Sequence, residues 1–126
     1  MRSFFVVHEH HARRLHYDLR IAMEGVLKSW AIPKEPPSEP GVRRLAIQTE
    51  DHELEYADFE GVIEEGYGAG EVRIWDRGEC EFESVREEKL VFHLRGGRLK
   101  GRYVLLRFPK GGERAWLFFR AREERE

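Results

Sequence analysis

The sequence predicts an all-β fold, specifically a small closed antiparallel β-barrel with long surface loops. Short runs of alternating apolar and polar residues recur along the whole chain, and no long segment has the period of an α-helix. Glycine-containing turn sequences separate these runs at distances that suit β-hairpins. Because the chain has only 126 residues, closing the sheet on itself is the simplest way to leave no exposed edge.

Nine strands are expected, each bounded by turn or loop residues. They cover residues 4–8, 15–22, 26–32, 44–49, 71–75, 80–85, 90–94, 102–108 and 115–120. Turns are expected at residues 24–25, 77–78, 96–97 and 110–112, where glycine allows the chain to reverse.

Three further segments are expected to be irregular. Residues 33–41 are rich in proline, which cannot join a ladder, and should form an extended surface loop. Residues 51–70 are the longest stretch without a strand pattern, and loops of that length are usually functional or mobile. Residues 122–126 form a charged terminal run that we expect to be frayed.

Composition limits the class of protein. The chain has 22 Lys and Arg against 24 Asp and Glu, a net charge of −2, so any contact with nucleic acid must be local. The single cysteine, Cys80, excludes an internal disulfide and a multi-cysteine zinc site. No segment resembles a signal peptide or a membrane-spanning helix. We therefore expect one domain spanning residues 1–126, cytoplasmic and monomeric, with no membrane partner.

The second expected strand carries the most informative pattern. Strict alternation places His16, Asp18 and Arg20 on one face, with apolar side chains on the other. His8 and His10, two residues apart on the preceding strand, form a second polar row that can face the first across a hairpin. Two imidazoles and a carboxylate suit Mn, Fe, Co, Ni or Zn. We predict that His10, His16 and Asp18 hold a catalytic metal ion with open coordination positions.

The other candidates depend on their context. Arg20 cannot ligate a metal and stays charged, so its role must be toward an anion. Lys34 and Arg44 flank the proline-rich loop and suit either a phosphate or a solvated surface. His52 lies among carboxylates at the start of the long irregular stretch, and a lone histidine there is more often a surface residue than a site residue.

Several other motifs favour structural interpretations. Residues 66–70 are rich in glycine but lack the helix and the lysine-serine pair of a phosphate-binding loop, so a tight turn is expected. We expect structural or surface roles for the remaining histidines and for the tryptophans, which are His11, His93, Trp30, Trp75 and Trp116.

Specific blocks of sequence identify a family. They cover residues 5–10, 14–20, 25–34, 44–48, 50–52, 56–61, 67–70 and 75–78. Over nearly its whole length the chain resembles the 3′-phosphoesterase domain of bacterial and archaeal DNA ligase D, in a stand-alone form. The resemblance implies a compact β-barrel that heals DNA 3′ ends with Mn²⁺. It implies removal of a 3′-terminal ribonucleoside and then of the remaining 3′-phosphate.

The resemblance also implies roles for individual residues. By motif position, the metal ligands are His10, His16 and Asp18. The side chains that contact the substrate phosphate are Arg20, Lys34, Arg44 and His52, and those assigned to catalysis are Arg20, His52 and Tyr56. Co²⁺ or Zn²⁺ could replace Mn²⁺. The implied partners are DNA or RNA/DNA 3′ ends, with a DNA ligase and end-joining proteins acting in trans.

Three departures from the family pattern are evident, and two other functions stay open. His8 replaces the usual glutamine, Glu9 replaces the usual lysine, and residues 63–67 are one residue short with glutamate where proline is usual. These changes leave the metal row intact but leave open the balance between the two activities.

One alternative is an iron oxygenase in which His93 joins His16 and Asp18 as a facial triad. Another is a barrel that binds nucleic-acid ends without catalysis.

Overall fold

The computed structural model describes residues 1–66 and 68–122, so part of the predicted turn at 66–70 and most of the charged terminal run lie outside the described residues. The strands are β1 (Arg2–His11), β2 (Leu15–Met23), β3 (Val26–Ile32), β4 (Arg43–His52), β5 (Gly61–Ile63), β6 (Gly70–Val85), β7 (Lys89–Gly96), β8 (Lys100–Arg107) and β9 (Ala115–Arg120). Two 3₁₀ turns, η1 (Leu54–Asp58) and η2 (Pro109–Gly111), complete the described elements. No helix among them is long and apolar enough to cross a membrane.

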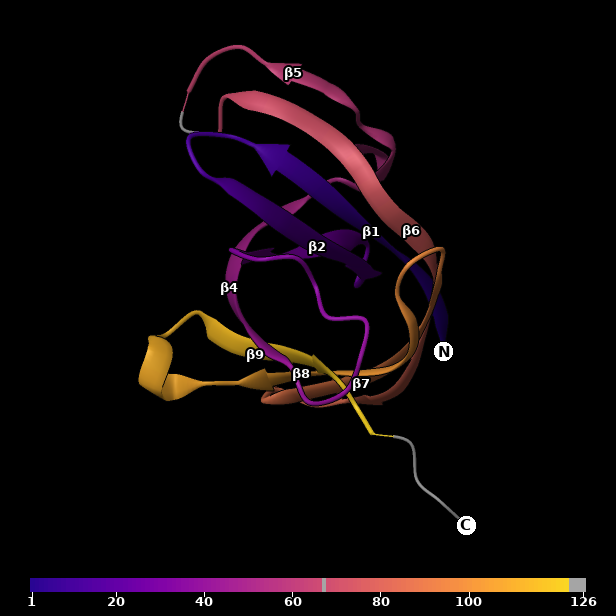
Figure 1. Ribbon diagram of the computed structural model, residues 1–126. Helices are drawn as coiled ribbons and strands as arrows, with labels where there is room; N and C mark the ends of the chain where they lie inside the picture. Colours follow the sequence, from indigo (N-terminus) through magenta and orange to yellow (C-terminus); the bar gives the residue numbers. More distant parts are fainter. Residues whose placement is uncertain (67, 123–126) are drawn as a thin grey trace.

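The sheet closes into an antiparallel barrel, as predicted. The strand order is β1-β2-β3-β4-β9-β8-β7-β6-β5, and an additional pairing of β1 with β6 joins the ends. Eight strands therefore form the closed ring, and β5 pairs only with the first residues of β6. Figure 1 shows β6 running from the part of the molecule that contains β1, β2 and β5 to the part that contains β7, β8 and β9.

Large apolar side chains fill the interior of the barrel. Phe5, Trp30, Phe92, Tyr103 and Phe118 are all less than 2% exposed. Trp116 belongs to the same core and Trp75 packs against it, so the structural roles expected for the tryptophans are confirmed. Because side chains occupy the interior, polar chemistry must lie on the outer face of the sheet.

A small second cluster covers part of that outer face. Val6, Ala22 and Leu27, from the first three strands, pack under Ala57 of η1. Leu54 and Tyr56 of η1 pack against the same cluster. The long segment after β4 therefore folds back over the sheet and partly buries the polar row that alternates with the core residues.

Two sequence-based expectations were wrong. Residues 77–78 do not form a turn, because Gly78 lies inside the continuous strand β6, opposite Phe5 on one side and Gly96 on the other. A Cβ at Gly78 would lie 2.1 Å from the Arg95 carbonyl oxygen, so close strand packing requires glycine there. The proline-rich loop is also more than a surface loop, because Pro36 and Pro37 are buried.

Candidate metal centre

The β1–β2 hairpin brings the predicted metal ligands together. Its register places His10 opposite His16 and His8 opposite Asp18. One donor atom from each of His10, His16 and Asp18 lies within 4.8 Å of the other two. His10 and Asp18 are buried and His16 is half-buried. These three side chains form a cluster that could hold a metal ion on the outer face of the barrel.

Backbone carbonyls orient both imidazoles toward Asp18. His10 Nε2 donates to the Gly68 carbonyl at 2.7 Å, and His16 Nδ1 donates to the Arg14 carbonyl at 3.2 Å. In a neutral imidazole the second ring nitrogen is then an acceptor. Those nitrogens, His10 Nδ1 and His16 Nε2, each lie 3.3 Å from Asp18 Oδ2. The three lone pairs converge, and a cation between them would satisfy all of them.

Electrostatics supports the same interpretation. Burial alone would raise the pKa of Asp18, but its interactions with His10 and His16, together with the Arg20 charge, stabilise the carboxylate and hold that pKa well below its ordinary value. The hydrogen bond to Asp18 raises the pKa of His16. The carboxylate is therefore ionised and attracts a proton to its histidine neighbour when no metal is bound. A divalent cation would replace that proton.

The Arg20 guanidinium is fixed beside the triad. Its Nε donates to His8 Nδ1 at 3.0 Å, its Nη1 to Ser29 Oγ at 2.9 Å, and its Nη2 to Asp18 Oδ2 at 3.3 Å. Arg20 is only 4% exposed, and each Nη nitrogen has a second N–H available for an anion. Burial lowers the pKa of Arg20, but a guanidinium stays charged at neutral pH.

His8 and Ser29 were not among the predicted site residues. His8 is fully buried, and burial together with the Arg20 charge lowers its pKa to about 4. It is therefore neutral, and its Nδ1 accepts the Arg20 hydrogen bond. Alternation had already placed His8 in the polar row with His10, and the β2–β3 register, which places Ser29 opposite Arg20, could have indicated Ser29.

An aromatic stack places His52 and Tyr56 beside Arg20. The Tyr56 ring stacks on His52 with centroids 4.5 Å apart and on Phe59 with centroids 5.1 Å apart. The Arg20 Cζ lies 4.9 Å from the Tyr56 centroid. Burial and the Arg20 charge lower the pKa of His52, and burial raises the pKa of Tyr56. Both side chains are therefore neutral at pH 7.

The other sequence candidates make no direct contact with the triad among the described residues. Arg44 Nε donates to the Glu35 carbonyl at 2.8 Å, and Lys34 is exposed. Among the described residues, no hydrogen bond or ion pair joins either cation to the triad. His93 pairs with Glu83 at 3.2 Å on another part of the barrel, so the facial triad of the oxygenase alternative does not form.

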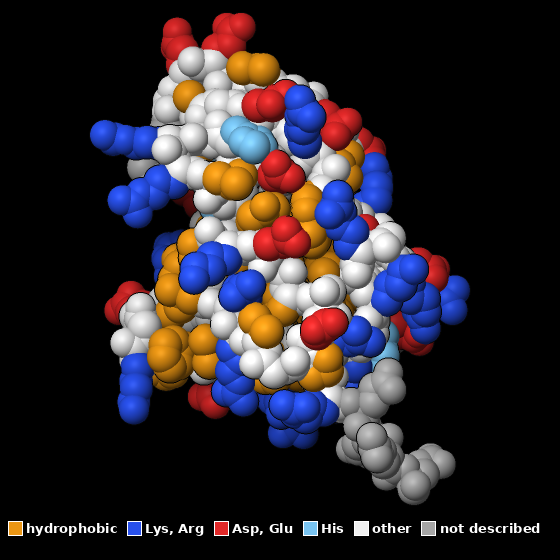
Figure 2. All heavy atoms as spheres, viewed as in Figure 1, with side chains coloured by type: hydrophobic (Ala, Val, Ile, Leu, Met, Phe, Trp, Pro, Cys, Tyr) orange, Lys and Arg blue, Asp and Glu red, His pale blue; other side chains and the backbone are white. Residues whose placement is uncertain are grey.

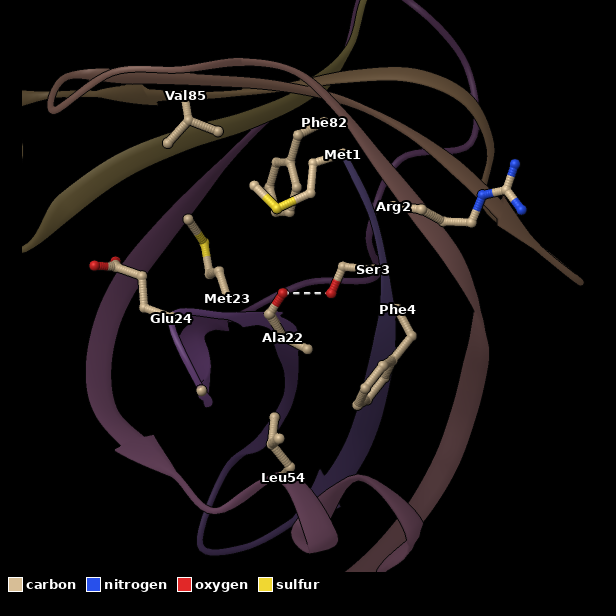
Figure 3. Close-up of a pocket in the computed structure, with 11 residues that line it drawn as sticks. Met1, Arg2, Ser3, Phe4, Ala22, Met23, Glu24, Leu54, Phe82 and Val85 are labelled. Carbon is tan, nitrogen blue, oxygen red and sulfur yellow. Dashed lines mark hydrogen bonds between the residues drawn. The ribbon is translucent and has the colours of Figure 1, made fainter.

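A separate hollow lies at the opposite end of β1. It has a volume of about 400 Å³. In Figure 3, Met1, Met23 and Phe82 point into it, and Ser3 Oγ donates to the Ala22 carbonyl at its edge. Its lining is mainly apolar and includes none of the triad residues. The polar centre on the outer face is therefore the better candidate for chemistry.

Comparisons with known proteins identify the family of the chain. A family profile described as the DNA ligase D 3′-phosphoesterase domain matches residues 8–107, which include the whole triad, Arg20, His52 and Tyr56. The chain belongs to the DNA ligase D 3′-phosphoesterase domain family. The resemblance inferred from the sequence is thereby confirmed.

The relatives of this phosphoesterase-family chain are much longer proteins. Multifunctional non-homologous end joining protein LigD of Mycobacterium bovis is 49% identical over 127 residues, covering 97% of this chain and 16% of that protein. LigD of Pseudomonas aeruginosa is 46% identical over 126 residues, covering 94% and 15%. LigD of Mycolicibacterium smegmatis is 44% identical over 133 residues, covering 96% and 17%. The chain spans about a sixth of the length of these relatives.

Proposed function

We propose that this chain is a metal-dependent phosphoesterase that restores a 3′-hydroxyl at DNA ends. It would remove a 3′-terminal ribonucleoside as a phosphodiesterase and a 3′-phosphate as a phosphomonoesterase. The observation that carries the proposal is the convergence of His10 Nδ1, His16 Nε2 and Asp18 Oδ2 beside the fixed Arg20 guanidinium. A cation site next to a buried guanidinium suits a phosphate ester, which carries negative charge on several oxygens.

Mn²⁺ is the proposed cofactor. Two imidazoles and one carboxylate form a borderline-hard donor set that suits Mn²⁺, and also Co²⁺ or Zn²⁺. Three protein ligands leave coordination positions for phosphate and water. A bound divalent ion would supply Lewis-acid stabilisation of charge on the phosphoryl oxygens.

The chain's own residues would position the phosphate and stabilise its charge. Arg20 has N–H groups left over from its three contacts and can donate them to phosphoryl oxygens. His52 would donate a hydrogen bond as a neutral imidazole, held in place by its stacking on Tyr56. Lys34 and Arg44 would meet the phosphates of the strand at the rim, which requires their long side chains to reorient when DNA binds.

The charge distribution favours recognition of an end over a grip on long duplex. The net charge is −2, and Figure 2 shows basic and acidic side chains interspersed over the face in view. A few local phosphate contacts give weak, salt-dependent affinity for duplex DNA. We propose 3′ ends of DNA or RNA/DNA strands as substrates. The relatives are named as non-homologous end joining proteins, which supports a role in end joining, in which a DNA ligase would act as a separate partner.

The direct test uses two primers on a DNA template, one ending in a 3′-phosphate and one in a single ribonucleoside. Each is incubated with the protein and Mn²⁺, Co²⁺, Zn²⁺ or no metal. The proposal predicts metal-dependent conversion of both primers to a 3′-hydroxyl end. Binding of these primers without turnover under every metal condition would instead support the non-catalytic end-binding barrel and overturn the proposal.

A further inference from the structure

A second hollow lies directly beside the candidate metal centre. It has a volume of about 510 Å³, and its wall includes the partly exposed rings of His52, Tyr56 and Phe59. Tyr56 is the central ring, since it stacks on both of the others. The Arg20 guanidinium lies 4.9 Å from the centroid of that central ring. Tyr56 therefore adjoins both the hollow and the guanidinium that is proposed to bind the phosphate.

The remaining lining of this hollow is acidic. Glu53, Glu55 and Asp58 contribute carboxylates, and no lysine or arginine is part of the lining. Arg77 reaches Asp58 from the edge at 2.7 Å. His52 adds no positive charge at pH 7, because burial and the Arg20 charge lower its pKa. A phosphodiester backbone would be repelled from these walls, whereas a neutral group would not.

We infer that the hollow binds the terminal nucleoside that leaves in the phosphodiesterase reaction. The inference rests on the proposed function and adds a subsite to it. A nucleobase can stack on the half-exposed Phe59 ring, since aromatic stacking tolerates any base. Base N–H groups and ribose hydroxyls can donate to the carboxylates of Glu53 and Glu55.

The chemistry of the two reactions explains why the ribonucleoside-ended substrate needs this subsite and the 3′-phosphate substrate does not. In the diesterase step, a water oxygen bonds to phosphorus and the bond from phosphorus to the nucleoside O5′ breaks. The leaving O5′ takes a proton, and the nucleoside departs without any phosphate. In the monoesterase step, the bond from phosphorus to the strand O3′ breaks, so the leaving group is the strand itself. A hollow beyond the phosphate is then empty.

The test compares the two substrates in Phe59→Leu. Leucine keeps apolar volume at the residue that follows η1 but removes the flat ring. The kcat/KM for the ribonucleoside-ended primer should therefore fall about tenfold or more relative to that for the 3′-phosphate primer. Phe4→Leu is the matched control, because Phe4 is also partly exposed but lines the apolar hollow at the other end of β1. The control should leave the ratio of the two values at its wild-type level. An equal fall for both substrates in Phe59→Leu would overturn the inference.

Free adenosine tests the same subsite without turnover. Titration of adenosine into the protein, followed by NMR shifts of residues 52–59, should saturate for the wild-type chain and weaken about tenfold for Phe59→Leu. Inorganic phosphate should shift His52, the proposed phosphate donor, but should not shift Glu53, Glu55 or Phe59. Failure of the wild-type chain to process either primer would defeat the proposed function, while the adenosine titration would still decide the subsite. Equal adenosine affinity in the wild-type and Phe59→Leu proteins would reject the inference.

Discussion

Two buried carboxylates, Asp18 and Asp76, have opposite environments. Asp76 lies on β6 and accepts three backbone N–H groups, from Gly97 at 2.7 Å, Arg98 at 3.1 Å and Leu99 at 2.7 Å. Asp18 lies on β2 and faces the ring nitrogens of two histidines and the Arg20 guanidinium. Both side chains are nearly inaccessible: Asp76 is 6% exposed and Asp18 is 5% exposed.

The difference separates a structural carboxylate from a functional one. The donors to Asp76 belong to the backbone of the β7–β8 turn, so folding alone satisfies that carboxylate. The histidines beside Asp18 each donate their N–H to a backbone carbonyl, and their other nitrogens need a proton or a metal ion. Burial of a carboxylate is thus weak evidence of function, whereas neighbours that need an added proton or metal ion beside it are strong evidence.

The largest expected effect comes from Asp18→Asn. The substitution keeps the shape but removes the charge that attracts the cation, so Mn²⁺ binding should be lost and turnover of the 3′-phosphate primer should fall about 10³-fold or more. The folded barrel should persist, because the apolar interior is untouched. Circular dichroism and steady-state kinetics on the same sample check both points. Turnover within tenfold of wild type would remove Asp18 from the centre.

Arg20→Lys should reduce turnover about 10²-fold while Mn²⁺ still binds. An ammonium cannot make the three contacts to His8, Ser29 and Asp18 and still present parallel N–H groups to phosphate. Single-turnover rates at saturating Mn²⁺ measure the effect. Loss of Mn²⁺ affinity equal to the loss of rate would show that Arg20 acts through the metal site and not on the substrate.

Asp76→Asn should act on stability and not on chemistry. The amide NH₂ would face backbone donors, leaving at least one of them unsatisfied, at a cost of about 2 kcal/mol. Chemical denaturation should show this loss, while kcat of the folded protein stays at the wild-type value. A fall in kcat with unchanged stability would erase the contrast between the two carboxylates.

His52→Gln should reduce turnover less than the changes to Asp18 and Arg20. Burial and the Arg20 charge lower the pKa of His52, so the folded protein holds this side chain neutral. Below pH 6.5 the unfolded chain takes up a proton at His52 more readily than the folded chain, so the contribution of His52 to the free energy of unfolding is full above pH 6.5 and is lost as pH falls. A neutral glutamine amide can replace the donor, so turnover should fall less than tenfold, against about 10²-fold for His52→Ala. Equal losses in both variants would favour a charged or ring-specific role.

Much of the fold and the triad could be predicted from the sequence because they depend on local alternation. The period of two in β1 and β2 places His10, His16 and Asp18 on one face, and a hairpin fixes which residues are opposite. The single-face pattern also separates Arg20 from the apolar residues that enter the core. Local sequence was sufficient wherever neighbours along the chain are neighbours in space.

Contacts between distant segments could not be predicted in the same way. The Gly68 carbonyl that orients His10 is 58 positions away from it. Gly78 has the sequence of a turn, and only the close approach of Arg95 from β7 explains glycine inside a strand. The stacking of Phe59 on Tyr56 depends on how the segment after β4 folds over the sheet.

The most direct measurement of the central claim is Mn²⁺ binding by electron paramagnetic resonance to the wild-type, Asp18→Asn and Asp76→Asn proteins. The account predicts one tightly bound Mn²⁺ per chain in wild type and in Asp76→Asn, and none in Asp18→Asn at the same free metal concentration. Stoichiometric Mn²⁺ in Asp18→Asn, or none in the wild-type protein, would contradict a metal centre built from His10, His16 and Asp18.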